Sequence, residues 1–237
     1  MTATVLGCSG SYPGPGQACS GFLVRTDTTT VWLDAGPGTL ANLQRHIDLL
    51  EVDAIVLSHE HPDHCADLAG YYVACKYYRQ RGHVAVYAPA GLQESVYYSG
   101  APLAWHEVAG GDEVDVGGLH LTFSRTDHPP ETLAVRVDGD GRSLAYSADT
   151  GPRWSLEQLG PGIDLAICEA TFLRSHEGSV QHLSARQAGE SARAAGVRRL
   201  VLSHLQPGLN PDASRDEGSA AFGALVEMAA EHQIYEV

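Results

Sequence analysis

The hexapeptide His59-Glu60-His61-Pro62-Asp63-His64 constrains this chain more than any other segment, because it places three histidines and an aspartate within six residues. Few folding requirements call for such a composition. Neutral imidazole and carboxylate groups suit zinc, manganese and iron, whereas the same groups desolvated without a metal would be costly to bury. A solvated polar loop is the alternative, but the apolar run over residues 52–57 leads directly into the motif. We therefore expect a metal site.

The composition limits the fold and the partners. A chain of 237 residues with 43% hydrophobic content is within the range of one large domain, so we expect a single domain over residues 1–237. The 15 basic and 29 acidic residues give a net charge of −14, which argues against a sequence-independent grip on nucleic acid. A local basic patch stays open, and bound divalent metal would offset part of the charge.

The cysteines and the first residues bear on location. The five cysteines are odd in number and form no Cys-x-x-Cys pair, which suits a reducing cytoplasm. The first six residues lack the basic segment and apolar stretch of a signal peptide. No apolar run approaches the roughly 18 residues of a membrane span. We expect a cytoplasmic protein without a membrane segment.

Histidine and aspartate recur where expected strands end. Apolar runs alternate with helical patterns, which predicts an α/β fold. Strands are expected at residues 52–57, 119–126, 143–147 and 199–202, followed closely by His59, His128, Asp149 and His204 respectively. If these strands end at one edge, the four side chains converge there, as catalytic groups on loops commonly do.

This convergence also sorts the twelve histidines. Six lie in helical or strand patterns or in polar segments, where a surface or packing role is the better interpretation: His46, His83, His106, His120, His176 and His232. The six that keep a functional interpretation are His59, His61, His64, His128, His182 and His204.

The set His59-x-His61-x-Asp63-His64, His128, Asp149 and His204 resembles the metallo-β-lactamase superfamily of hydrolases, over essentially the whole chain. The resemblance implies an αβ/βα four-layer sandwich, with two β-sheets packed face to face and helices outside. It places His59, His61 and His128 on one metal ion, Asp63, His64 and His204 on a second, and Asp149 between the two. Zinc is the first expectation for both ions and manganese the second.

Two further acidic positions refine the resemblance. Asp34, after an expected strand over Thr30–Leu33, matches the superfamily's first acidic motif, which usually supports the metal histidines from behind. Asp149 stands where the true zinc β-lactamases have a cysteine in the second site, so antibiotic hydrolysis is a poor interpretation. The family form has glycine where this chain has Ala148, and we expect a small backbone adjustment with intact metal binding.

Two divalent ions about 3.5 to 4 Å apart can share one hydroxide and clamp the oxygens of a substrate. Lowering the pKa of water from about 15.7 to about 7 makes a nucleophile available at neutral pH. The bridging hydroxide is therefore the expected nucleophile, with Asp63 among the residues that hold it. No serine or cysteine nucleophile is needed, and Cys65 is interpreted as a buried thiol.

The segment Glu169-Ala170-Thr171-Phe172, followed by His182-Leu183-Ser184, resembles the Glu-Ala-Thr-Phe and His-Ser-Thr segments of the ribonuclease Z branch. In that branch the histidine serves the leaving oxygen of a phosphodiester, which makes His182 the expected general acid. Its alternative role is a neighbour of the helix expected after Ser184. Glu169 either orients His182 or is a plain carboxylate at a strand end.

The branch also has a glycine-rich first loop, which residues 6–11 resemble; such glycines serve either an anion or a tight turn. Ribonuclease Z enzymes grip transfer RNA with a long basic arm between the third histidine motif and the bridging aspartate. Only twenty residues separate His128 from Asp149 here, and they predict two strands around a turn at Asp138-Gly139-Asp140-Gly141. No arm fits in that interval.

We therefore expect a phosphodiesterase for a small substrate, plausibly a cyclic nucleotide, similar to the compact relatives of ribonuclease Z. Transfer RNA 3′-processing and the hydrolysis of lactones or thioesters are the enzymatic alternatives. A metal-stabilised binding module is the non-enzymatic one. The resemblance also implies a homodimer. The net charge and the missing arm make nucleic acid a minor expectation as a partner, and no membrane partner is expected.

Overall fold

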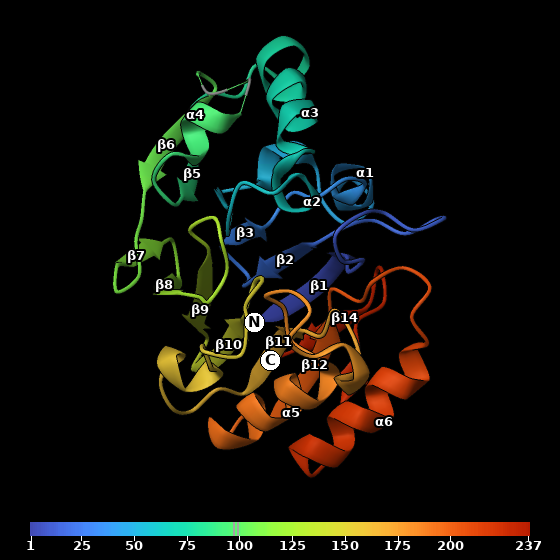
Figure 1. The fold of residues 1–237 in the computed structure, drawn as a ribbon. Helices are drawn as coiled ribbons and strands as arrows, with labels where there is room; N and C mark the ends of the chain where they lie inside the picture. Colours follow the sequence, from blue (N-terminus) through green and yellow to red (C-terminus); the bar gives the residue numbers. More distant parts are fainter. Residues whose placement is uncertain (97, 99) are drawn as a thin grey trace.

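The computed structural model describes residues 1–96, 98 and 100–237. The chain folds into two mixed sheets of seven strands that pack face to face, with helices on both outer sides (Figure 1). The first sheet has the order β14-β1-β2-β3-β4-β5-β6 and the second β13-β12-β11-β10-β9-β8-β7. The expected four-layer arrangement is confirmed.

The first sheet consists of β1 (Thr2–Gly7), β2 (Gly21–Arg25), β3 (Thr30–Leu33), β4 (Ala54–Val56), β5 (Val84–Ala88), β6 (Leu103–Glu107) and β14 (Ile234–Glu236). The second consists of β7 (Glu113–Val116), β8 (Leu119–Arg125), β9 (Leu133–Gly139), β10 (Arg142–Tyr146), β11 (Leu165–Glu169), β12 (Arg199–Ser203) and β13 (Glu227–Met228). Strands β3 to β6 of the first sheet pair in parallel, and so do β10 to β13 of the second. Within each set the carboxyl ends therefore lie at one edge of the sheet.

The helices are α1 (Thr39–Leu43), α2 (Pro62–Cys65), α3 (Leu68–Val73), α4 (Leu92–Ser95), α5 (Ala185–Ala194) and α6 (Pro211–Phe222). The π-helical turn η2 (Ala74–Arg79) continues α3, and the 3-10 turns are η1 (Leu49–Glu51), η3 (Leu156–Leu159) and η4 (Arg174–His176). Ser184 caps α5 by accepting a hydrogen bond from the backbone of Gln187, as the sequence predicts for an N-cap.

Three apolar clusters hold the four layers together. The central cluster lies between the sheets and includes Phe22 and Val31 from the first and Ile167 from the second, all at most 1% exposed. Trp32 belongs to the cluster under α1 to α3, and Ala188 to the one under α5 and α6. Side chains alternate between these clusters along the central strands, so the middle of each sheet is buried on both faces, whereas the edge strands β7 and β14 are largely exposed.

The interval between His128 and Asp149 is filled by the hairpin of β9 and β10. Asp140 (φ 53°) and Gly141 (φ 69°) form its turn, and two consecutive left-handed residues are what a tight two-residue hairpin requires. The predicted turn is confirmed, and the interval contains no inserted arm.

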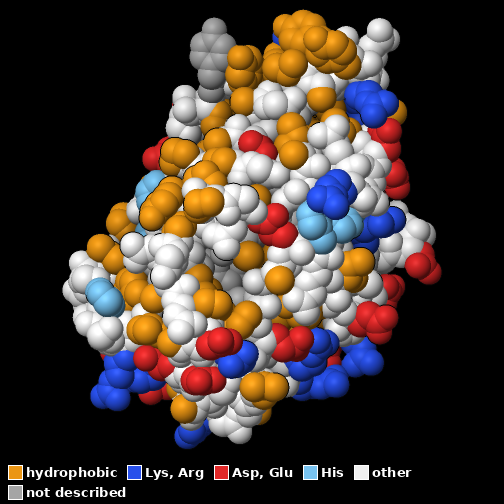
Figure 2. All heavy atoms as spheres, turned by 90° about the vertical axis from the view of Figure 1, so that its right-hand side faces the viewer, with side chains coloured by type: hydrophobic (Ala, Val, Ile, Leu, Met, Phe, Trp, Pro, Cys, Tyr) orange, Lys and Arg blue, Asp and Glu red, His pale blue; other side chains and the backbone are white. Residues whose placement is uncertain are grey.

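Hydrophobic side chains gather at the end of the molecule formed by α3 and η2 (Figure 2). Tyr77 and Tyr78 are 63% and 80% exposed there, while Tyr71 is fully buried. On the same face, lysine and arginine side chains are interspersed with acidic ones (Figure 2). None of the helices within residues 1–96 and 100–237 combines the length and the apolar character needed to span a bilayer.

Candidate metal centre

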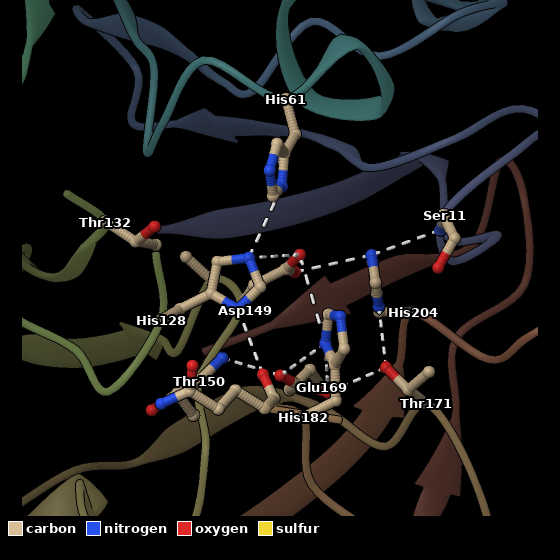
Figure 3. A network of polar contacts seen from close by, with 12 residues as sticks. Ser11, His61, His128, Thr132, Asp149, Thr150, Glu169, Thr171, His182 and His204 are labelled. Carbon is tan, nitrogen blue, oxygen red and sulfur yellow. Dashed lines mark hydrogen bonds and ion pairs between the residues drawn. The ribbon is translucent and has the colours of Figure 1, made fainter. Parts of the chain in front are cut away.

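Seven side chains that the sequence marks as metal ligands meet at the shared edge of the two sheets. Figure 3 shows four of them, His61, His128, Asp149 and His204. The loop after β4 supplies His59 and His61 and, through the first turn of α2, Asp63 and His64. The loops after β8, β10 and β12 supply one residue each: His128, Asp149 and His204. The ligand atoms form two groups, and within each group all of them lie within 4.8 Å of one another.

The first group consists of His59, His61, His128 and Asp149. His61 Nδ1 lies 2.9 Å from His59 Nε2 and 3.3 Å from His128 Nε2. Asp149 Oδ2 lies 3.6 Å from His59 Nε2 and 3.9 Å from His128 Nε2. Four donor atoms from both sheets therefore surround one point.

The second group consists of Asp63, His64, Asp149 and His204. His204 Nε2 lies 3.3 Å from Asp63 Oδ2, 3.3 Å from Asp149 Oδ1 and 3.4 Å from His64 Nε2. Asp149 thus belongs to both groups and uses a different oxygen in each. This is the placement that the resemblance implies for a bridging carboxylate.

The donor atoms fit divalent metal ions. Bonds of 2.0 to 2.1 Å to a tetrahedral zinc ion put neighbouring ligand atoms about 3.3 Å apart, close to the separations within both groups. Asp149 Oδ1 is buried and makes no hydrogen bond, although His64 Nε2 lies 3.2 Å away. A buried carboxylate oxygen without a hydrogen bond is rare unless a cation completes it. Groups of this kind favour zinc and also accept manganese.

Asp34 holds His64 from behind, as its motif predicts. Its carboxylate accepts hydrogen bonds from His64 Nδ1 at 2.7 Å, from Ser58 Oγ at 2.8 Å and from the hydroxyl of Tyr146 at 2.6 Å. Ser58 Oγ also lies 3.0 Å from His59 Nδ1. The Nδ1 atoms of both histidines are therefore engaged, which leaves each Nε2 directed at its ligand group.

His128 and His204 are fixed in the same way by residues that the sequence did not mark as supports. His128 Nδ1 donates to the backbone carbonyl of Gln181 at 2.9 Å, and His204 Nδ1 to Thr171 Oγ1 at 2.9 Å. Thr171 in turn donates to Glu169 at 2.7 Å. The Thr171 contact follows from its place in the Glu-Ala-Thr-Phe segment, whereas a backbone carbonyl carries no sequence signal. Tyr146 is marked only by its place three residues before Asp149.

The charges in the cluster shift the pKa values in opposite directions. Burial and the neighbouring His64 lower the pKa of His59 well below its usual value. Burial alone would lower the pKa of His64, but Asp149 and Asp34 raise it well above the usual value. Burial would raise the pKa of Asp63 and Asp149, but the adjacent histidines lower both. Both aspartates are therefore carboxylates at neutral pH, the form that binds a metal.

Glu169 and His182 meet beside the two groups. His182 Nδ1 lies 3.1 Å from Glu169 Oε1 and 4.0 Å from Asp149 Oδ2. Glu169 is 2% exposed and also accepts hydrogen bonds from the backbone amides of Thr150 and Leu183, so its carboxylate is fixed on several sides. Burial alone would lower the pKa of His182, but Glu169 raises it to about 9. Of the two interpretations of Glu169, the structure supports the one that orients His182.

Several backbones at the site adopt the left-handed conformation that side chains rarely take. Asp34 (φ 56°), Ala148 (φ 49°) and His204 (φ 58°) each lie just past a strand of the shared edge. Ala148 thus keeps the conformation that the family supplies with glycine, at a cost of about 1 kcal/mol. Three such residues at one edge are typical of a functional site held by its surroundings.

The glycine-rich first loop has a packing role at the site. A side chain on Gly10 would put its Cβ 2.8 Å from His204 Nδ1, closer than real contacts allow. The loop also joins the end of β12, because the backbone amide of Gly10 donates to the carbonyl of Leu205. Close approach of the backbone to His204 explains Gly10, a reason that neither interpretation from the sequence, an anion site or a tight turn, had included.

The remaining histidines lie outside the two ligand groups, and the cysteines lack disulfide partners. Among the described residues, the metal-like groups include none of the six histidines assigned to surface or packing roles. All five cysteines are free thiols. Cys65 is buried, which raises its thiol pKa to about 11, so it is a poor nucleophile.

Comparison with known proteins agrees with the fold and the site. Residues 29–205 match the family model of the β-lactamase superfamily domain. The Mycobacterium tuberculosis protein Rv1339 is 36% identical over 250 residues, which cover 99% of this chain and 91% of that one. The probable metallo-hydrolase YhfI of Bacillus subtilis is 28% identical over 243 residues, and the match covers all of both chains.

Solved structures extend the comparison. The crystal structure of YhfI superposes with a TM-score of 0.90 at 26% identity and covers 99% of this chain and 98% of that one. Human tRNase Z, short form, superposes with a TM-score of 0.79 at 20% identity and covers 100% and 99%. The chain belongs to the metallo-β-lactamase superfamily, and this membership supports a metal-dependent hydrolase. Ribonuclease Z of Mycobacterium bovis is a further relative, 26% identical over 246 residues that cover 89% of this chain and 88% of that one.

Proposed function

We propose that this protein is a two-metal phosphodiesterase for a small substrate, plausibly a cyclic nucleotide. The observation that carries the proposal is the position of His182, which Glu169 holds by Nδ1 beside the candidate bridging residue Asp149. An unactivated phosphodiester needs a proton on its departing oxygen, and an imidazole at this place can deliver it from Nε2.

Each part of the site has a task in this reaction. Bound divalent ions supply a nucleophile of hydroxide strength at neutral pH and polarise the phosphoryl oxygens. His59, His61 and His128 would hold one ion, and Asp63, His64 and His204 the other, with Asp149 shared. We assign zinc first, since five of the seven groups are imidazoles, and manganese second. Glu169 keeps His182 protonated, and the positive charge of bound ions would move the pKa of His182 from about 9 back toward neutrality.

His182→Ala tests the proposal. Turnover of an unactivated phosphodiester such as a cyclic nucleotide should fall by about 10² to 10⁴. Turnover of bis(4-nitrophenyl) phosphate should fall much less, because 4-nitrophenolate departs without a proton. The matched control is His120→Ala, which removes a histidine paired with Asp115 at the other end of β8 and should leave both rates unchanged. Equal, small losses on both substrates would refute the acid role and favour lactone or thioester hydrolysis.

Transfer RNA 3′-processing is the second candidate, since human tRNase Z, short form, shares the fold. The compact β9–β10 hairpin and the net charge of −14 disfavour it here. The two are separated by assaying zinc-loaded protein on cyclic nucleotides and on a transfer RNA precursor, and cleavage of the precursor alone would favour this alternative. Metal-loaded protein inert on phosphodiesters, lactones and thioesters alike would favour a metal-stabilised binding module.

We further propose a homodimer in the cytoplasm. The exposed Tyr77 and Tyr78 at the end of α3 and η2 are suited to an interface, because tyrosine contributes apolar area together with a polar tip. Solution scattering should then give twice the 25.2 kDa chain mass, and a single-chain mass at micromolar concentration would refute the dimer.

A further inference from the structure

A cavity of about 470 Å³ opens beside the candidate metal centre, between α3 and α4. It borders the centre directly, because Glu60 and His61 of the histidine motif form one of its walls. A separate cavity of about 610 Å³ borders the other flank, where His128 and His182 line it. The two cavities share no lining residue, so a substrate at the metals has room on two sides.

The walls of the two cavities differ in chemistry. The cavity beside His61 is lined largely by apolar side chains, among them Leu68, Ala69 and Val96. The cavity beside His182 contains a charged pair, Asp127 and Arg153, which form an ion pair with each other, next to the polar Ser179 and Gln181 and the apolar Pro129, Pro152 and Val180. An apolar cavity of a few hundred Å³ with few polar groups is typical of a small-molecule site.

Tyr98 gives the apolar cavity an aromatic wall. Its ring stacks on that of Tyr72, with centroids 5.0 Å apart and planes at 30°. Tyr72 is 6% exposed, so the stack is anchored in the core under α3. The same lining includes Glu60, whose exposed carboxylate is polar where the Tyr98 ring is apolar. This carboxylate can accept hydrogen bonds from N–H or O–H groups. A flat ring with polar edges satisfies both kinds of wall.

We infer that the cavity beside His61 is a substrate subsite for a flat aromatic group, such as a nucleobase, attached to the phosphate that the metals hold. The inference rests on the proposed phosphodiesterase function and specifies its substrate. The part of the substrate that stays on phosphorus lies between α3 and α4, while the departing oxygen lies toward His182. Apolar walls give the ring its binding energy, and the carboxylate of Glu60 favours rings that carry hydrogen-bond donors.

The test varies only the group that stays on phosphorus. Zinc-loaded protein is assayed on the 4-nitrophenyl phosphodiesters of methanol, cyclohexanol and phenol, which all release 4-nitrophenolate. The phenyl ester should exceed the methyl ester in kcat/KM by about tenfold or more, because stacking on an aromatic side chain is worth that much. The cyclohexyl ester, of similar size but not flat, should fall between them. Equal values for phenyl and cyclohexyl would refute the flat-ring assignment.

Filling the cavity should remove this preference. Ala69→Phe places a ring in the lining, so the phenyl-to-methyl ratio of kcat/KM should drop at least about fivefold. Ala41→Phe, on the exposed side of α1, is the matched control and should keep the wild-type ratio. A second variant, Tyr98→Leu, should lower the ratio without filling the space. An undiminished ratio in both cavity variants would overturn the proposal.

A binding measurement separates this proposal from the proposed function. Phenylphosphonate and methylphosphonate are titrated into zinc-loaded protein by calorimetry, with no reaction involved. Tighter binding of phenylphosphonate by about tenfold, lost in Ala69→Phe, supports the subsite even if no phosphodiester is hydrolysed. Hydrolysis of all three esters without any preference, and equal binding of the two phosphonates, would remove the subsite and leave the phosphodiesterase standing.

Discussion

The two sheets contribute to the candidate metal centre in different ways. The first sheet supplies four donor residues from a single loop after β4, within His59 to His64. The second supplies three, one after each of β8, β10 and β12, spread from His128 to His204. The local motif can be recognised from the sequence without knowledge of the fold. The three dispersed residues come together only because the strands before them end at one edge. Each ligand group nevertheless draws on both sheets, so a bound ion would link them.

The largest expected effect comes from Asp149→Ala, because this residue of the second sheet belongs to both ligand groups. Phosphodiester turnover should fall by at least about 10³-fold, more than the loss of one oxyanion donor causes, and the bound metal should drop below one ion per chain. His61→Ala touches only the first group and should keep about one ion. Elemental analysis of both variants makes the comparison, and two ions retained in Asp149→Ala would contradict the shared role.

Metal removal should loosen the connection between the sheets. At a free metal concentration one hundred times Kd, binding stabilises the folded protein by about 2.7 kcal/mol per site. For a chain of this size, the loss of both ions corresponds to a fall in Tm of roughly 10 to 20 °C after chelation. Calorimetry before and after dialysis against a chelator measures it, and restored zinc should restore Tm. An unchanged Tm would show that the ions do not join the two sheets.

Asp34→Asn probes the support behind the first sheet's motif. The amide cannot serve all three donors that the carboxylate accepts from Ser58, His64 and Tyr146. Zinc affinity of the second group should fall by about 10- to 100-fold, as for other residues that orient a metal histidine. A competition titration with a chromogenic chelator measures this. Asp53→Asn, at the opposite end of the paired strands β3 and β4, is the control; an equal loss there would mean a general effect on stability.

Glu169→Gln probes the corresponding support in the second sheet. The carboxylate raises the pKa of His182, so a neutral amide should lower it. His182 acts in its protonated form, and the basic limb of the kcat profile for an unactivated phosphodiester should therefore move to lower pH. Glu157→Gln, on the exposed turn η3, is the matched control. A basic limb that stays at the wild-type pH would argue against His182 as the acid.

The smallest effect is expected from Ala148→Gly. Glycine relieves the left-handed strain of about 1 to 2 kcal/mol, which stabilises the folded protein. It also loses the buried methyl group, worth about 0.8 kcal/mol, and raises the conformational entropy of the unfolded chain, and both effects destabilise the folded protein. The free energy of unfolding should change by less than about 1 kcal/mol, by denaturant titration. Ala148→Val should lower it by more, because a branched side chain tolerates this conformation poorly. A large gain for glycine would mean that the turn is more strained than its φ indicates.

Much of this site could be predicted from the sequence, but not all of its supports. The histidine motif is local, and the strand-end pattern correctly brought Asp149 and His204 to it. The strands expected at residues 119–126 and 143–147 from their apolar residues agree with β8 and β10 to within one or two residues at each end. The contact of His128 with Gln181 was out of reach, because any residue has a backbone carbonyl. The cavity between α3 and α4 was equally hidden, since it depends on how two separate helices pack.

The hydrogen bond between His128 and Gln181 has a further consequence. Gln181 precedes His182 directly, so a single peptide unit links the anchor of a candidate metal ligand to the proposed proton donor. The Gln181 side chain also donates to Asp127, the residue before His128, which ties the same two segments together a second time. The covalent geometry of this segment therefore fixes the spacing between the candidate metal ligand His128 and His182, which the proposed reaction uses as the acid. Movement of the surrounding loop can displace both residues together but can hardly change the distance between them.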